Sequence, residues 1–320
     1  MNGQELTAAY RRAYALTDRY MLEKAEKAVR ELAAYTGAEY GTQSGQHSQS
    51  LIALGEWHQA AGEYPAAETL LAGVVQTRRR LYGSRHRHTA AALHSLGMVQ
   101  LDRWQIEKAA GSLKQALDIF REQYGSTPHA STALALNDHA CALSALGRTD
   151  EALGGFEASA AMHEQLFGMD HARTALAYTN AAAIYCRQGY TEEALSVLKH
   201  TLPVQRRCSG ANHPRTAAVL TETAAVYSRT GRPAEAEACY RQASDGLFRL
   251  LGRHHPLYAR SLYSFALHHL RCHRHREALA LLTRALPVFA DAYDEDSPLM
   301  QNLMRLTAML VLREAADEAA

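Results

Sequence analysis

Small and apolar residues recur along the chain at a constant interval of about 42 residues. A column of glycines keeps this interval: Gly41, Gly83, Gly125, Gly168, Gly210 and Gly252. Successive members lie 42, 42, 43, 42 and 42 residues apart. Two further columns stay in phase with it, one of alanine (Ala67, Ala109, Ala152, Ala194, Ala236, Ala278) and one of mostly leucine (Leu51, Leu93, Leu136, Tyr178, Leu220, Leu262). Three columns in phase over six units indicate internal duplication.

One unit, residues 210–251, shows what is repeated. Its first half places Leu220, Ala224 and Tyr227 on one helical face, and its second half is another amphipathic run. Gly231 and Pro233 separate the two halves. Such a helix–turn–helix cannot bury its own apolar stripe, so it requires neighbours of the same kind. The pattern therefore predicts an all-α solenoid.

Other positions in each unit predict how the helices meet. Four residues after the leucine column stands a small residue (Gly55, Gly97, Ala140, Ala182, Ala224, Ala266), which allows two helices to approach closely. The following turn carries Gly62, Gly147, Gly189 or Gly231, a residue that adopts positive φ without strain. Trp104 and His273 replace this glycine in two units, so we expect those turns to be made differently. Pro203 and Pro287 predict bends within two second helices.

The ends of the chain fit the same pattern. Residues 1–40 are interpreted as a degenerate N-terminal repeat, 41–293 as six repeats of 42 or 43 residues, and 294–320 as a C-terminal capping helix. The last of these aligns with a first helix that has no second helix, and its polar end suits a cap that faces water. We expect one continuous array.

Composition excludes several classes of protein. The hydrophobic fraction is 47% and the formal net charge is +1, which disfavours disorder and nucleic-acid binding. The basic spots at Arg78–Arg80, Arg85–His88 and Arg206–Arg207 are expected at helix ends and junctions. No apolar run is long enough to span a bilayer, and no signal peptide is recognisable at the N-terminus. Five cysteines without a Cys-x-x-Cys pair favour a reducing cytoplasm.

The loop between units carries a motif that resembles a known family. His213-Pro214-Arg215-Thr216-Ala217 and His171-Ala172-Arg173-Thr174-Ala175 are its clearest copies, and residues 86–90 match in part. Together with the Leu, small, Tyr, Gly, Tyr and Ala positions, this motif resembles the tetratricopeptide repeat (TPR) in the 42-residue form of kinesin light chains. The resemblance implies a right-handed TPR superhelical solenoid of about seven helix-turn-helix repeats plus a C-terminal capping helix. It also implies that peptides or partner proteins bind in a concave groove lined by the first helices, as a rule without catalysis.

Residues on the open face of each first helix are candidates for that groove. Positions one, five and nine after the leucine column point away from the buried stripe at 100° per residue. Position nine is arginine in three successive units, Arg187, Arg229 and Arg271, which predicts a ladder for an acidic peptide or a terminal carboxylate. The alternative is a solvated face whose charges were copied by duplication. The remaining groove candidates are His94, Asn137, Thr179, Asn180, Thr221 and Tyr263; the resemblance places Asn137 and Asn180 at ligand-binding asparagine positions of kinesin light chains.

Two groups of histidines are considered as candidates for a metal site. His86, His129, His171, His213 and His255 recur one repeat apart, too far apart to share an ion, so we expect them to cap helices or bond neighbouring carbonyls. His268 and Cys272, and likewise His269 and His273, are spaced four apart and are weak candidates for a metal site. Drift within the repeat explains them equally well. No cofactor is expected.

The sequence thus favours a non-catalytic protein–protein interaction scaffold that binds a peptide or partner in the groove. No phosphate-binding loop, nucleophile elbow or His-Glu-x-x-His motif is present. Two alternatives remain: a regulatory sensor that binds a small ligand or signal peptide, and an enzyme recruited from the scaffold. For the latter, Cys141 and Cys186 with His94 or His139 are the first residues to inspect.

Overall fold

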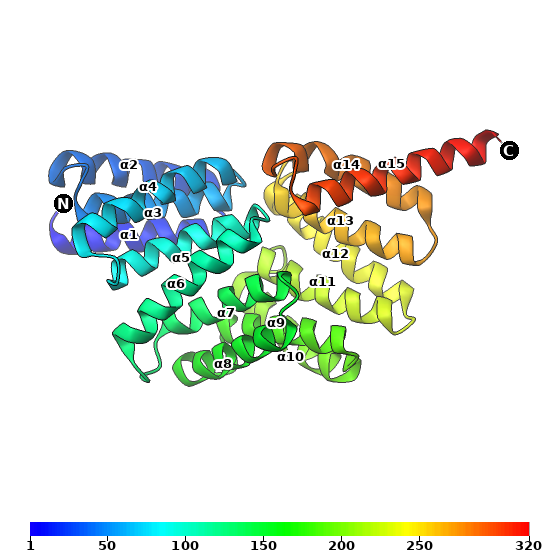
Figure 1. The fold of residues 1–320 in the computed structure, drawn as a ribbon, viewed down its shortest axis with the longest axis horizontal. Coiled ribbons are helices and arrows are strands. Elements are labelled where there is room, and N and C mark those ends of the chain that lie inside the picture. The colour runs from blue at the N-terminus through cyan, green and yellow to red at the C-terminus, as the bar shows by residue number, and fades with distance from the viewer. Residues whose placement is uncertain (320) are drawn as a thin grey trace. The chain divides into compact units, whose positions relative to one another are not determined.

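The computed structural model describes residues 1–319, and within this range the chain forms α-helices and no strand (Figure 1). The helices are α1 (Gly3–Asp18), α2 (Leu22–Tyr40), α3 (Gly45–Ala60), α4 (Tyr64–Tyr82), α5 (Arg87–Asp102), α6 (Ile106–Tyr124), α7 (Ala130–Ala145), α8 (Thr149–Phe167), α9 (Ala172–Gln188), α10 (Thr191–Ser209), α11 (Pro214–Arg229), α12 (Pro233–Leu251), α13 (Pro256–Arg271), α14 (His275–Ala292) and α15 (Pro298–Ala319).

The helices group into two compact units. The first, Met1–Leu166, contains α1 to α7 and nearly all of α8; the second, Phe167–Ala320, contains α9 to α15. Within the first unit α1, α3, α5 and α7 contact one another in turn, and within the second unit α9, α11 and α13 do the same. In the second unit, for example, α11 contacts α12, α9 and α13. The first helices of a unit therefore form one continuous layer.

Small residues permit the close approach within a pair, as the pattern predicts. A Cβ atom added to Gly55 would lie 2.7 Å from Cγ of Leu71, and one added to Gly97 would lie 2.7 Å from Cγ of Leu113. In both pairs a leucine of the second helix occupies the space that a larger side chain would need. Ala182, Ala224 and Ala266 are fully buried at the same position in the second unit.

The recurring histidines begin the first helices. His86, His129, His171, His213 and His255 each occupy the N-cap, and Nδ1 accepts a hydrogen bond from the backbone N–H two residues later, at 3.1–3.2 Å. Such a cap satisfies a backbone donor that has no partner within the helix. The predicted structural role of these histidines is thus what the structure displays.

The prediction that Trp104 and His273 change the turn geometry is wrong. Both residues adopt the left-handed conformation of the glycines that they replace, with φ of 62° and 58°, against 72° for Gly231. The turn between the helices of a pair therefore keeps its geometry. Trp104, His273 and also Tyr20, with φ of 54° in the first pair, carry the steric cost of that conformation.

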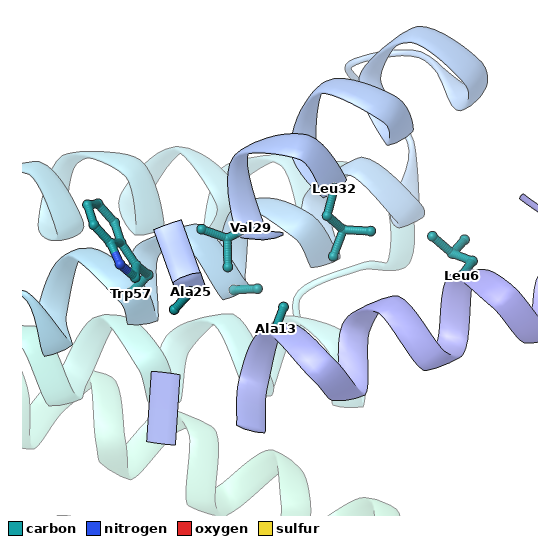
Figure 2. Packing of buried hydrophobic residues seen from close by; sticks show 7 residues of the cluster. Leu6, Ala13, Ala25, Val29, Leu32 and Trp57 are labelled. Atoms are coloured by element: carbon teal, nitrogen blue, oxygen red, sulfur yellow. The ribbon is translucent and has the colours of Figure 1, made fainter. Parts of the chain in front are cut away.

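The N-terminal segment packs as the first pair of its unit. Leu6 and Ala13 of α1 meet Val29 and Leu32 of α2, and Trp57 of α3 closes the cluster (Figure 2). Trp57 Nε1 also donates to the backbone oxygen of Leu22, 2.9 Å away. The degenerate sequence of α1 therefore still supplies a buried face.

The C-terminal helix has one buried face and a few exposed apolar residues. Leu299, Met300 and Leu303 of α15 are buried, whereas Val311 and Leu312 are 50% and 72% exposed. The polar end predicted from the sequence begins directly after them, at Arg313. Elsewhere, α10 and α14 continue through Pro203 and Pro287, so neither proline ends its helix.

Candidate functional site

Three arginines stand at the C-terminal ends of successive first helices. Arg187 lies in the last turn of α9, and Arg229 and Arg271 are the last residues of α11 and α13. All three side chains are exposed. A cation is favoured at this end of a helix because the terminal carbonyl groups carry partial negative charge. The three arginines therefore occupy equivalent positions on successive first helices, as their 42-residue spacing predicts.

All three guanidinium groups act electrostatically on the buried thiol of Cys186. Burial raises the pKa of Cys186, and Arg229, Arg271 and Arg187 each act on it in the opposite direction. Because α9 contacts α11 and α11 contacts α13, their axes are expected to lie about 8–10 Å apart. The arginines thus form a row across the layer of first helices.

A fourth arginine belongs to the same row. Arg313 of α15 follows Arg271 by 42 residues and is exposed. Asn302 of α15 donates a hydrogen bond from Nδ2 to the hydroxyl of Tyr263 on α13, which fixes the two helices side by side. Arg313 was not among the predicted groove residues, although the 42-residue count reaches it when continued by one step. The row is called the arginine ladder below: Arg187, Arg229, Arg271 and Arg313.

The ladder keeps most of its hydrogen-bonding capacity. Within the described residues, Arg229, Arg271 and Arg313 make no side-chain hydrogen bond or ion pair. At the same register in the first unit, Asp102 instead accepts a hydrogen bond from Gln59 Nε2 at 2.7 Å. The two units therefore differ in charge at this position, and the donors are available in the second.

An apolar row runs beside the ladder. Ala183, Ala225, Leu267 and Met309 lie four residues before the respective arginines, which is one helical turn away on the same face. The first three are partly exposed and Met309 is 49% exposed. A ligand that crosses these helices would meet a cationic edge and an apolar floor.

Glu222 is an acidic group that interacts with the ladder. This side chain of α11 is partly buried, and burial raises the pKa of its carboxyl group while Arg187 opposes that rise. Its negative charge offsets part of the positive charge of Arg187. Glu222 was not among the candidates from the sequence.

Two predicted groove residues face the protein interior. Thr179 is fully buried, and its hydroxyl donates to Ala175 O at 2.8 Å and to Thr201 Oγ1 of α10 at 3.1 Å. Asn137 is 3% exposed and donates from Nδ2 to Asp138 Oδ1 at 2.9 Å. Neither side chain is placed to line an open face, so neither is kept in the candidate site.

The other groove candidates are partly exposed. Asn180, Thr221 and Tyr263 belong to the layer of first helices in the second unit, and Tyr263 is held by Asn302. In the first unit, His94 Nε2 lies 2.7 Å from Asp138 Oδ2. His94 is therefore engaged in a link between α5 and α7.

The histidine–cysteine cluster of α13 is explained by its neighbours. His268 Nδ1 lies 2.9 Å from Ser228 Oγ, Cys272 Sγ lies 3.7 Å from His268 Nε2, and His269 stacks on Phe265. His273 lies in the turn with positive φ. Within residues described by the structure, no three His, Cys, Asp or Glu side chains are arranged to hold a metal ion.

Two of the groups named for catalysis, Cys186 and His139, have pKa values shifted by burial. Burial raises the pKa of Cys186, which disfavours the reactive thiolate. His139 lines a pocket of about 230 Å³ with Lys114, Asp118 and Arg121, and burial lowers its pKa.

In the described part of the chain, each helix is too short or too polar to span a lipid bilayer.

The repeat of this chain matches a known protein family. The family model described as tetratricopeptide repeat matches residues 46–122, 131–207 and 173–247, which together exceed half of the chain. Comparison with curated protein sequences gives no match.

Several solved structures share the fold. A putative kinesin light chain with TPR-like repeats from Podosopora anserina has 20% identity and a TM-score of 0.50, over 63% of this chain and 95% of that one. NprR in complex with its cognate peptide NprX has 13% identity and a TM-score of 0.65, over 100% of this chain and 87% of that one. The apo form of the quorum sensor NprR from B. thuringiensis has 13% identity and a TM-score of 0.58, over 96% of this chain and 81% of that one.

These identities establish a common fold, and the resemblance to kinesin light chain repeats is confirmed. TPR proteins in general bind protein or peptide partners and are non-catalytic scaffolds. From the helix pairs, their conserved spacing and the family model, the chain belongs to the tetratricopeptide repeat family.

Proposed function

We propose that this chain is a non-catalytic interaction scaffold that binds an acidic peptide segment, or a partner's terminal carboxylate, on the open face of its second unit. The observation that carries the proposal is the arginine ladder. Its members are exposed, and Arg229, Arg271 and Arg313 have no side-chain partner within the described residues. Arginine presents a planar fork of donors that matches a carboxylate.

Magnitudes favour a ligand with several acidic groups over a single one. An exposed ion pair contributes about 0.2–1 kcal/mol. One such contact cannot hold a ligand, because association itself costs at least about 4 kcal/mol. Several contacts on one chain act together, and the apolar row adds burial of hydrophobic surface. A multivalent acidic segment therefore suits this surface.

The test compares two triple variants of equal charge. A fluorescein-labelled peptide of glutamates is titrated with the wild-type chain, with Arg229→Ala/Arg271→Ala/Arg313→Ala, and with a control variant. The control replaces Arg206, Arg207 and Arg249, which are exposed on second helices α10 and α12. The ladder variant is expected to lose about tenfold in affinity or more, with unchanged helical circular dichroism. Equal losses in both variants would show that only net charge matters and would refute the site.

A second candidate function is a sensor that responds to a signal peptide. NprR is recorded with its cognate peptide NprX, so a protein of this fold can hold a peptide. A sensor must favour a different conformation when bound. Solution X-ray scattering with and without the acidic peptide separates the two candidates, because a passive scaffold keeps the same scattering profile.

A further inference from the structure

Resting on the proposed function, we infer that the ligand of the arginine ladder is a polyproline II segment with an acidic residue at every third position and an apolar residue beside it. The arginines on α9, α11, α13 and α15 keep a constant register. Their spacing across the helices sets the spacing that the ligand's charges must match.

Each arginine of the ladder is called a rung. The distance between neighbouring rungs follows from the distance between packed helices. Consecutive first helices run in the same direction, because each is joined to the next through one antiparallel second helix. Residues at the same register on two such helices are separated by about the distance between the axes. Packed helices lie about 8–10 Å apart. Because α9 contacts α11 and α11 contacts α13, the arginines on these helices are expected about every 9 Å.

Only one regular peptide conformation repeats its faces at this distance. A polyproline II helix has three residues per turn and rises about 3.1 Å per residue, so every third side chain returns to the same face after about 9 Å. In a β-strand the same face recurs about every 6.6 Å, and in an α-helix one turn rises about 5.4 Å. The strand and the α-helix would therefore fall out of step with the ladder within two rungs.

The apolar row accounts for a second face of the ligand. Ala183, Ala225, Leu267 and Met309 keep the same 42-residue interval as the arginines, so they repeat at the same distance across the helices. A threefold helix that turns its acidic face to the ladder turns an adjacent face to this row. The third face points to water.

The charges around the ladder also predict how many acidic residues the ligand should carry. Arg187 is partly offset by Glu222, whereas no acidic side chain is paired with Arg229, Arg271 or Arg313 within residues 1–316. Three consecutive rungs are thus fully cationic. The strongest binding is expected for a segment with at least three acidic residues in the repeating pattern.

The experiment uses three labelled 12-residue peptides of identical composition, four glutamates, four prolines and four alanines. One repeats Glu-Pro-Ala, one places glutamate at every second position, and one clusters the glutamates at one end. Each is titrated with the full chain by fluorescence anisotropy at low ionic strength. The three-residue repeat is expected to bind about tenfold more tightly than the other two, because only it engages every rung.

Variants separate this inference from the proposed function. Arg229→Ala/Arg271→Ala should abolish the preference for the three-residue repeat, and the charge-matched Arg206→Ala/Arg249→Ala should retain it. If all three peptides bind equally and all weaken in the ladder variant, the spacing is wrong and the acidic site stands. If no peptide binds, or if the ladder and control variants behave alike, both proposals are overturned.

Discussion

Thr174 Oγ1 donates a hydrogen bond to the backbone oxygen of Gly168, 2.9 Å away, and so closes the loop that begins α9. The same bond joins Thr89 to Gly83 at 2.8 Å and Thr216 to Gly210 at 2.7 Å. This contact explains why glycine, histidine and threonine recur together at the junctions. The junction after Gly125 contains an extra residue and lacks this bond.

Thr132, the counterpart of Thr174 at that junction, has a buried hydroxyl with no hydrogen-bond partner among the described residues. We therefore expect opposite effects from one substitution at two sites. Thr174→Val should lower the free energy of unfolding by about 1 kcal/mol, since it removes a satisfied bond and leaves Gly168 O unpaired. Thr132→Val should be neutral or stabilising. Urea unfolding of both variants tests this, and a larger loss for Thr132→Val would contradict it.

The N-cap histidine His171 makes stability depend on pH. Burial lowers the pKa of His171, and nearby Arg173 and Arg215 lower it further. A histidine whose folded-state pKa is depressed contributes stability that is complete above its unfolded value of about 6.5. This contribution is lost as pH falls from that value through the depressed one, because the protonated ring cannot accept the hydrogen bond at Nδ1. The chain is therefore expected to weaken as pH falls below about 6.5.

His171→Asn isolates this effect, because asparagine caps a helix without titrating. Burial depresses the pKa of His88, His139, His268 and His269 as well, so the variant should lessen the loss of stability between pH 7.5 and 5.5 without abolishing it. Urea unfolding at several pH values gives the slope. His254→Asn, at an exposed histidine that caps no helix, serves as the control. An unchanged slope for His171→Asn would rule out the cap as a source of the pH dependence.

The left-handed turn residue His273 offers a stabilising change. Its φ is 58° and its side chain is exposed, so glycine removes steric cost and sacrifices little packing. His273→Gly should raise the free energy of unfolding by about 1 kcal/mol. Gly231→Ala, at the same turn one repeat earlier, should lower it by a similar amount. Thermal unfolding measures both, and a lower midpoint for His273→Gly would show that the ring itself stabilises the turn.

The repeat period predicted the helix pairs because a duplicated unit keeps its spacing. Individual side chains were harder, as Thr179 and Arg78 show. Thr179 was assigned to the open face by its angle around the helix, but its hydroxyl reaches Thr201 of α10. A second helix therefore covers a wider arc of the first helix than the apolar stripe alone suggests.

Arg78 illustrates the opposite difficulty, because composition suggested a basic spot at a helix end. The side chain is 2% exposed and donates to His88 O at 2.7 Å and to Gln49 Oε1 at 2.6 Å. Its register is that of Phe120, which is a core position. The 42-residue count could have placed it inside, whereas no pattern in the sequence specifies the polar partners that make its burial tolerable.

Glu222 should limit the affinity of the ladder for acidic ligands. Burial raises the pKa of its carboxyl group above the usual value, and Arg187 stabilises the charged form against that rise. In its ionised form this carboxylate repels a ligand's acidic groups at the rung formed by Arg187. Glu222→Gln removes this charge at nearly constant size, so the Glu-Pro-Ala repeat should bind about threefold more tightly. The variant should also unfold at no lower urea concentration, since a buried charge is replaced by a neutral group.

Glu193→Gln, at an exposed glutamate near the start of α10, changes net charge equally and should leave the affinity nearly unchanged. Equal effects of the two substitutions would mean that the peptide responds to the overall field of the protein and does not contact the first rung.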